Sequence, residues 1–339
     1  MEKEFYAIKN KNDDVRRTSS SGGVFYSLAS YIIENDGIVY GAAYDKDINV
    51  FHKRITNKEE IRDLQGSKYV QSNVGDAYKQ VKEDLEAGKK VLFSGSPCQI
   101  AALKNILKDV NTDNLLLVDI VCHGTPAINY FNDYKKYMED KYHSKIKSID
   151  MRYKEKKEYD KRKINGYVKE SKIEPHVMKV EFENNKVYTM SSGLDIYYQL
   201  FDYFIKKSCF KCPYSNLNRE SDVTIGDFHE LSSSLGKFND GNGVSLAIIN
   251  TEKGKEYFEY VKDNFELEKK KEEECLQPAI QNSANEPKRY KEFIEDYEKL
   301  SFSEIVKKYT NNSIKFKVKK VLYKVGLLDL IRTMKKGKR

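Results

Sequence analysis

Five cysteines are the residues of this chain best suited to chemistry. Cys98, Cys122, Cys209 and Cys212 lie in loop-like segments that contain Gly or Pro, and the last two form Cys-x-x-Cys-Pro. Thiolates are soft ligands that select iron–sulfur clusters or zinc. A [4Fe–4S] cluster takes four cysteines, and Cys-x-x-Cys followed by Pro is a familiar part of such sites. Cys275, in a charged helical stretch, is interpreted as incidental.

The residues leave four interpretations of the loop cysteines open. Structural zinc usually uses paired motifs, whereas Cys98 and Cys122 are single, which favours an iron–sulfur cluster over zinc. Thiol catalysis would use Cys98, at the start of a helix that stabilises its thiolate, with His123 as the base. Four reduced, partly buried thiols without a ligand are the remaining interpretation.

A strand–loop–helix unit occurs twice in succession and positions two of the cysteines. The first unit has a strand at 91–93 before the loop with Cys98, and the second has a strand at 115–121 before the loop with Cys122. Such units join into a parallel sheet by right-handed crossovers. Both loops then leave the same carboxyl edge of the sheet, where α/β proteins bind ligands. The topology therefore predicts that Cys98 and Cys122 lie near each other.

The rest of the pattern predicts an α/β fold with a mixed, partly parallel sheet, flanking helices and a charged helical C-terminal extension. Residues 140–172 are dense in charge and are interpreted as a solvated insertion or mobile loop. Two alternating segments around 184–185 predict a hairpin. His229 is expected to face the same site as Asp227, and His52 is expected at the surface. The predicted domains are an N-terminal α/β subdomain at 1–90, a second α/β subdomain with the cysteines at 91–250, a helical extension at 251–313 and a basic amphipathic tail at 314–339.

The net charge of +8 is not spread evenly over the chain. Residues 315–339 hold ten Lys and Arg and one acid, so the remainder is close to neutral, unlike the basic folded face of a nucleic-acid-binding domain. The 39% of hydrophobic residues excludes disorder of the whole chain. No apolar stretch approaches the roughly 18 residues of a membrane span, and the start lacks the pattern of a signal peptide. We therefore expect an intracellular, cytoplasmic protein with reduced thiols.

Six motifs between about residues 16 and 250 together resemble one known family. They are SSSGGV at 19–24, GSKYVQS at 66–72, FSGSPCQ at 93–99, VDIVCHG at 118–124, CFKC at 209–212 and DVTIGDF at 222–228. In this order and spacing the chain resembles the coenzyme F420 hydrogenase/dehydrogenase beta-subunit family. The resemblance implies an FAD-dependent oxidoreductase that also holds a [4Fe–4S] cluster. Electrons or hydride would pass between the cluster, FAD and a deazaflavin coenzyme or another acceptor.

The resemblance also implies which residues bind the cofactors. It makes the first subdomain the flavin side and the second the catalytic one. The cluster ligands would be Cys98, Cys122, Cys209 and Cys212. FAD would lie against two loops and, at its isoalloxazine end, near the turn after the strand at 91–93; the residues concerned are Ser20, Ser21, Gly22, Gly23, Ser67, Lys68, Tyr69, Gly95 and Ser96.

The sequence departs from the family pattern in three places. No ferredoxin-type domain of clustered cysteines precedes Cys98, so electrons are expected to come from a ferredoxin or another redox subunit. His229 stands where many members carry Trp, and residues 151–154 read Met-Arg-Tyr-Lys where Phe-Arg-Asp-Lys is usual. Truncated members of this kind resemble those encoded among cell-surface polysaccharide genes. The alternative function is therefore a non-catalytic accessory protein of cell-surface polysaccharide biosynthesis with a structural zinc site made by the four cysteines.

The C-terminal residues predict a basic amphipathic helix. Apolar residues recur at helical spacing, with lysines off that face; they are Ile314, Val318, Val321, Leu322, Val325 and Leu328. Such a helix lies in the headgroup layer of anionic membranes, or it packs on the protein's own body or on a partner. The expected location is therefore the cytoplasm, with peripheral contact at the inner face of the membrane as one outcome.

Overall fold

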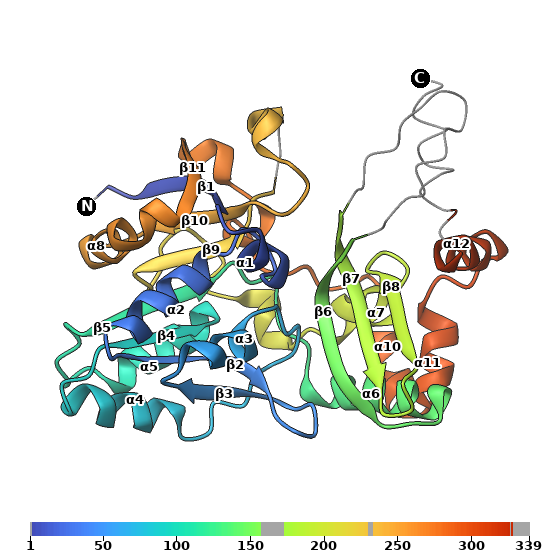
Figure 1. Ribbon diagram of the computed structural model, residues 1–339. Helices are drawn as coiled ribbons and strands as arrows, with labels where there is room; N and C mark the ends of the chain where they lie inside the picture. Colours follow the sequence, from blue (N-terminus) through green and yellow to red (C-terminus); the bar gives the residue numbers. More distant parts are fainter. Residues whose placement is uncertain (1, 157–172, 230–232, 326, 328–339) are drawn as a thin grey trace.

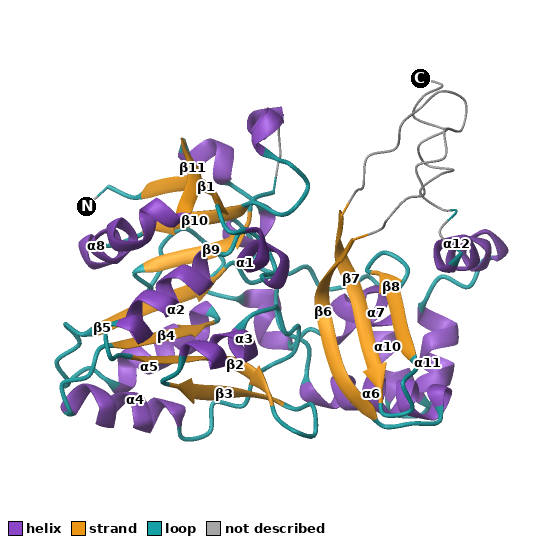
Figure 2. Cartoon of the chain, in the orientation of Figure 1, coloured by secondary structure: helices purple, strands orange, loops and turns teal. Residues whose placement is uncertain are grey.

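The computed structural model describes residues 2–156, 173–229, 233–325 and 327. The described residues form two β-sheets with helices packed on them (Figures 1 and 2). The larger sheet has eight strands, in the spatial order β11 (Phe265–Lys270), β1 (Glu4–Asn10), β10 (Ser245–Ile249), β9 (Val223–Asp227), β5 (Leu115–Ile120), β4 (Val91–Gly95), β2 (Ile38–Tyr44) and β3 (Val50–Ile55).

The four central strands of this sheet, β2, β4, β5 and β9, run parallel to one another. The strands on either side pair antiparallel with their neighbours. This arrangement confirms the predicted α/β class with a mixed, partly parallel sheet. The segments predicted as 1–90, 91–250 and 251–313 all contribute strands to this one sheet.

Helices cover both faces of the larger sheet. One face packs against α2 (Val24–Glu34), α3 (Ile61–Leu64) and α8 (Glu252–Val261), and the other against α4 (Ala77–Glu86) and α5 (Pro97–Ile106). Successive strand residues point to opposite faces, so Leu116 packs with the first group of helices and Leu117 with the second. Burial on both faces explains why these parallel strands are almost continuously apolar.

The smaller sheet has the order β6-β7-β8 and lies beside the larger one (Figure 1). Its strands are β6 (Ile146–Lys156), β7 (Ile173–Phe182) and β8 (Val187–Ser191), and its core includes residues of α6 (Ile128–Tyr142), α7 (Ile196–Phe204), α10 (Tyr290–Tyr297) and α11 (Phe302–Tyr309). The hairpin predicted around 184–185 is confirmed, because β7 and β8 pair antiparallel on either side of it.

The prediction of a solvated loop at 140–172 is wrong for its first half. Residues 146–156 form β6, and Ile149 and Met151 are buried in the core of the smaller sheet. Arg152 and Lys154 are buried too, because Asp227 and main-chain carbonyls satisfy their charges. At Arg152 and Lys154 the charge is therefore satisfied inside the protein, whereas Lys145 and Lys147 are exposed. Residues 157–172 lie outside the described part of the chain.

The remaining α-helices of the described chain are α1 (Asp13–Thr18), α9 (Glu272–Cys275) and α12 (Ile314–Lys324). The last of these confirms the predicted helix at the start of the basic tail. Among the helices in the described ranges, none has both the length and the apolar character needed to cross a bilayer.

Candidate functional site

A cavity of about 340 Å³ lies at the carboxyl edge of the parallel strands. The loops that follow α1, α3, β4 and β5 line it, together with the end of β9 and Arg152 of β6. The flavin residues predicted from the family resemblance all line this cavity except Gly22. Cys98, Cys122 and Cys209 line it as well. The structure thus brings most of the predicted site residues to one place.

The glycines of the loop at 19–23 shape the approach to α2. Gly22 packs behind the cavity wall, because a Cβ there would lie 2.2 Å from the carbonyl oxygen of Ile8. Gly23 has a φ of 91°, which favours glycine, and precedes α2 without a capping side chain. The N–H groups at the start of α2 are therefore not capped by the preceding side chain, an arrangement that suits a phosphate.

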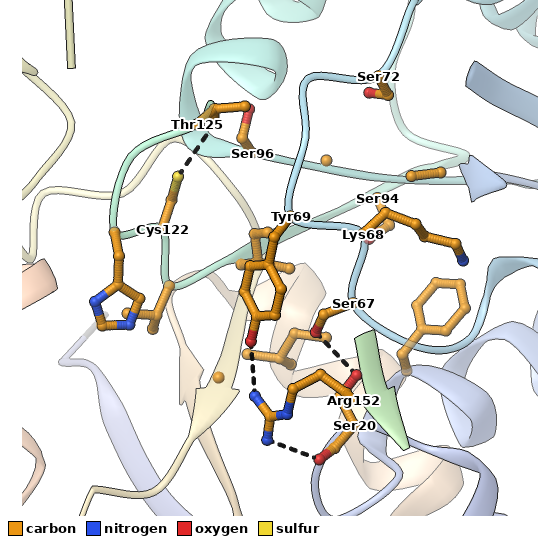
Figure 3. Close-up of a pocket in the computed structure, with 18 of the residues that line it drawn as sticks. Ser20, Ser67, Lys68, Tyr69, Ser72, Ser94, Ser96, Cys122, Thr125 and Arg152 are labelled. Carbon is orange, nitrogen blue, oxygen red and sulfur yellow. Dashed lines mark hydrogen bonds between the residues drawn. The ribbon is translucent and has the colours of Figure 1, made fainter. Parts of the chain in front are cut away.

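Lys68 is predicted as a flavin contact, but its ammonium group forms hydrogen bonds within the protein. Nζ donates to the carbonyl oxygens of Asp63 (2.9 Å) and Gln65 (2.8 Å), at the C-terminal end of α3, where a cation is favourable. Its side chain points away from Cys122 (Figure 3). Burial lowers the pKa of Lys68 to about 7. Lys68 therefore fixes the loop that lines the cavity.

Parallel pairing brings Cys98 and Cys122 to the same edge of the sheet. Gly95 of β4 pairs with Asp119 of β5, and in each chain segment the cysteine follows three residues later. This confirms the predicted proximity of the two loops. Burial raises the pKa of the Cys122 thiol to about 11, and the neighbouring Cys98 and Cys209 add to the effect. Cys122 is therefore a neutral thiol at pH 7, which would release its proton on binding a metal.

The Cys-x-x-Cys segment forms a 3₁₀ turn at Lys207–Lys211. Cys209 lines the cavity, whereas Cys212 follows the turn and is not part of the lining. Within the described ranges, no three Cys, His, Asp or Glu side chains stand close enough together to hold a single metal ion. Cys275 is buried in an apolar cluster and does not line the cavity. The ligand roles of the four loop cysteines stay a prediction.

A buried ion pair connects the two segments that carry these cysteines. Arg219 and Asp119 approach to 3.0 Å, with side chains 1% and 0% exposed. Arg219 also donates to the carbonyl oxygens of Tyr214 (3.0 Å) and Ile120 (3.0 Å). Ile120 lies two residues before Cys122. Arg219 therefore fastens the chain just after Cys212 to the chain just before Cys122.

A second buried ion pair lies in the cavity wall. Arg152 reaches from β6 to Asp227 (2.7 Å) and also donates to the Tyr69 hydroxyl (2.8 Å) and the Ser20 carbonyl oxygen (3.1 Å), as Figure 3 shows in part. Burial alone would raise the pKa of Asp227, but Arg152 outweighs it and the pKa is lowered. The Ser20 and Ser67 hydroxyls, 2.9 Å apart, join the two loops beside this pair. Arg152 thus ties the smaller sheet to both loops predicted to hold FAD.

His52 is buried at the cavity, so the expectation of a surface position is wrong. It stacks on Phe93, with ring centroids 4.9 Å apart. Nε2 lies 3.1 Å from the Ser94 carbonyl oxygen, which only accepts, so Nε2 carries the proton and Nδ1 accepts from Ser72 at 3.0 Å. Burial lowers the pKa of His52 to about 4. The expectation for His229 is confirmed, because it lines the cavity together with Asp227.

Two regions of a known family match this sequence. Residues 5–79 match the N-terminal part, and residues 88–274 the C-terminal part, of the coenzyme F420 hydrogenase/dehydrogenase beta subunit. The chain belongs to this family of oxidoreductase subunits. A chain of the F420-reducing [NiFe] hydrogenase complex from Methanosarcina barkeri is similar in fold, with a TM-score of 0.51 and 17% identity over 90% of this chain and 89% of that one. None of the curated proteins matches the chain.

In this member of the beta-subunit family, the site residues that were not predicted from the sequence are buried charged residues. Asp119 interrupts the apolar strand LLLVDI, and a carboxylate at a buried strand position requires a buried partner. This pattern could have identified Asp119 as a buried acid. It could not have identified Arg219 as its partner, because only the fold brings the two residues together. Arg152 alternates with apolar residues of β6, but the charge around it concealed this pattern.

Replacing Arg219 with Met should strongly destabilise the protein. The change leaves Asp119 buried without its cation, which costs about 3–5 kcal/mol in comparable cases. Lys104→Met is the control, since it breaks an ion pair with Glu220 whose side chains are 46% and 42% exposed, worth about 0–1 kcal/mol. Urea unfolding at pH 7 measures both, and similar small losses in the two variants would contradict a supporting role for Arg219.

The buried His52 should make the fold sensitive to acid. Its pKa falls from the ordinary 6.5 to about 4, so the neutral form stabilises the fold above pH 6.5 and this contribution is lost as the pH falls toward 4. Between pH 7.5 and pH 5 the cofactor-free protein should lose about 2 kcal/mol more unfolding free energy than His52→Gln does. Parallel pH dependences of the two proteins in urea unfolding would show that His52 is not buried as described.

Proposed function

We propose that this chain is an iron–sulfur flavoprotein oxidoreductase. It would pass electrons or hydride between a [4Fe–4S] cluster, FAD and an acceptor. The observation that supports this proposal most is a single cavity lined by three of the four predicted cluster cysteines and by eight of the nine predicted flavin residues. Redox partners must be close for electrons to pass between them, and one cavity meets that requirement.

The donor set suits a [4Fe–4S] cluster held by Cys98, Cys122, Cys209 and Cys212. Three of these thiols line the cavity, and the fourth, Cys212, directly follows the short turn that carries Cys209. A cluster of four irons is wider than one ion, so its thiolates stand further apart than those of a zinc site. Within the described residues no single-ion site is assembled, so nothing favours the alternative of a structural zinc site made by the four cysteines.

The polar groups of the cavity suit FAD. The uncapped start of α2 and the serines at 20 and 21 would hold the diphosphate, and Ser67 and Tyr69 would flank it. Gly95 and Ser96, next to Cys98, would lie at the isoalloxazine end. Bound FAD supplies hydride and electron transfer, while the protein positions it and adjusts its electrostatics.

Arg152 provides a guanidinium group that is held in a fixed position in this site. Its Nε is buried and has no hydrogen-bond partner among the described residues. Such an orphaned donor is costly unless a ligand satisfies it. Asp227, Tyr69 and the Ser20 carbonyl hold the guanidinium in one orientation, so it would meet an anionic or carbonyl group without reorganisation.

The donor and the acceptor of electrons belong to the same proposal. Four of the five cysteines would be used by one cluster, so these 339 residues leave a single cysteine, too few for a second cluster. Electrons would therefore be exchanged with a ferredoxin or another redox subunit. The similar chain from Methanosarcina barkeri belongs to a multi-subunit F420-reducing hydrogenase complex, which supports a partner subunit and a deazaflavin or related acceptor.

Replacement of each predicted ligand with Ser should lower the bound iron and sulfide. Cys98→Ser, Cys122→Ser, Cys209→Ser and Cys212→Ser remove one thiolate each from a four-cysteine cluster. Cys275→Ser is the matched control, since Cys275 lies outside the cavity. Iron, sulfide and zinc are measured after anaerobic purification and reconstitution. Zinc without sulfide would support the alternative of a zinc site. If the protein bound neither iron nor zinc, the prediction of a cluster would be wrong.

Arg152→Lys should weaken FAD binding. Lysine keeps the positive charge but loses the planar fork and the Nε donor, and a hydrogen bond to a charged group is worth about 1.5–3 kcal/mol. The dissociation constant of FAD, measured by fluorescence titration, should therefore rise about ten- to a hundredfold.

The control for Arg152→Lys is Arg16→Lys. The Arg16 side chain is as buried as that of Arg152 (6% and 5% exposed) and pairs with Asp240 at 2.6 Å, but Arg16 does not line the cavity. Its variant should bind FAD with unchanged affinity. Equal weakening in the two variants would mean that loss of buried arginines acts through stability, and unchanged binding in both would remove Arg152 from the flavin site.

A further inference from the structure

Helix α12 lies at the edge of the molecule, next to α11 and away from the larger sheet (Figure 1). Ser313 caps its start, because the hydroxyl oxygen accepts the N–H of Phe316 at 3.3 Å. Tyr323 is 5% exposed and belongs to the core of the smaller sheet, and Phe316 and Leu322 pack partly against it. One face of α12 thus packs on the protein, so the opposite face points away from it.

The opposite face is apolar and uncovered. Ile314, Val318, Val321 and Val325 recur every three or four residues, and they are 82%, 50%, 60% and 60% exposed. Together with Leu327 they make up five of the ten strongly exposed large apolar side chains in the described part of the chain. Scattered exposed apolar residues need no explanation, but a continuous row on one helix face indicates a partner surface.

Lysines flank this apolar row on both sides. At about 3.6 residues per turn, Lys317 and Lys324 fall on one side of it and Lys315 and Lys319 on the other. Lys320 instead turns toward the protein body and lies over the Phe316 ring at 5.2 Å. The predicted face is corrected accordingly, since Leu322 belongs partly to the packed side, and Leu328 lies outside the described residues.

The charge of α12 limits which partner can cover its apolar face. The helix contains no acidic residue, and the sequence after it, 328–339, adds five Lys and Arg and one Asp. A second copy of the chain, paired through the same face, would bring two sets of lysines together with no acids in the helix to neutralise them. An apolar strip between two rows of lysines matches the boundary between acyl chains and anionic headgroups.

We propose that α12 docks the protein on an anionic lipid surface. The row from Ile314 to Val325 enters the boundary between headgroups and acyl chains, and the flanking lysines contact phosphate groups. This docking does not depend on the cofactors, because α12 packs on the smaller sheet and contributes no residue to the cavity lining.

Flotation of the full-length protein with vesicles tests this docking. Vesicles of equal parts phosphatidylglycerol and phosphatidylcholine should bind the protein, whereas pure phosphatidylcholine should bind at least about tenfold less, and added salt should reduce the binding. The double variant Val318→Asp/Val321→Asp should bind the mixed vesicles at least about tenfold less than the wild type.

The matched control is the double variant Ile106→Asp/Ile128→Asp, which adds the same two negative charges at apolar positions, 49% and 47% exposed, at the end of α5 and the start of α6. It should float with the vesicles like the wild type, and both variants should keep the wild-type melting temperature. Equal binding of the double variant, or no binding of the wild type, would overturn the proposal. A dimer seen by analytical ultracentrifugation that the double variant abolishes, without vesicle binding, would assign the face to a second copy instead.

Discussion

The parallel pairing of β4 with β5 is the constraint on which the site depends. Because the two strands run in the same direction at the centre of the sheet, the loops after them must emerge at one edge. β9 extends the parallel order and brings Asp227 to the same edge. Helices on both faces close off the rest of the sheet, so the open edge is where chemistry is possible. Cys98 and Cys122 are neighbours for this reason, although a strand and a helix separate them in the sequence.

Two buried arginines add what the sheet alone does not provide. Arg219 fixes the Cys-x-x-Cys segment relative to the end of β5, and Arg152 fixes the smaller sheet relative to the cavity. Each is held by a carboxylate and by further oxygen acceptors, so its orientation is determined by several contacts at once. Buried pairs of this kind are costly to desolvate and costly to break. Because they lie where separate segments of the chain meet, they fix the geometry of the site.

Local pattern predicted much of this fold and part of the site. The apolar strands with loops at 94–98 and 122–126 predicted the parallel order, whereas the residues that line the cavity were predicted from the family resemblance of the loop motifs. The prediction was wrong where charged or polar residues are buried. The lysines and the arginine of β6 led to the prediction of a loop, and the polar neighbours of His52 led to the prediction of a surface position. The partners Asp227 and Asp119 lie far along the chain from Arg152 and Arg219, and only the fold brings them together. The family resemblance contributed the cofactors, which pattern alone left open.

The central claim is that one cavity at the carboxyl edge of the parallel strands holds an iron–sulfur cluster beside a flavin. Anomalous diffraction from anaerobically grown crystals, collected on both sides of the iron edge and of the zinc edge, tests this proposal. We expect iron between Cys98, Cys122 and Cys209, with Cys212 as the fourth ligand, and flavin density along the loops at 19–23 and 66–69. Iron at another place, or signal at the zinc edge alone, would contradict it.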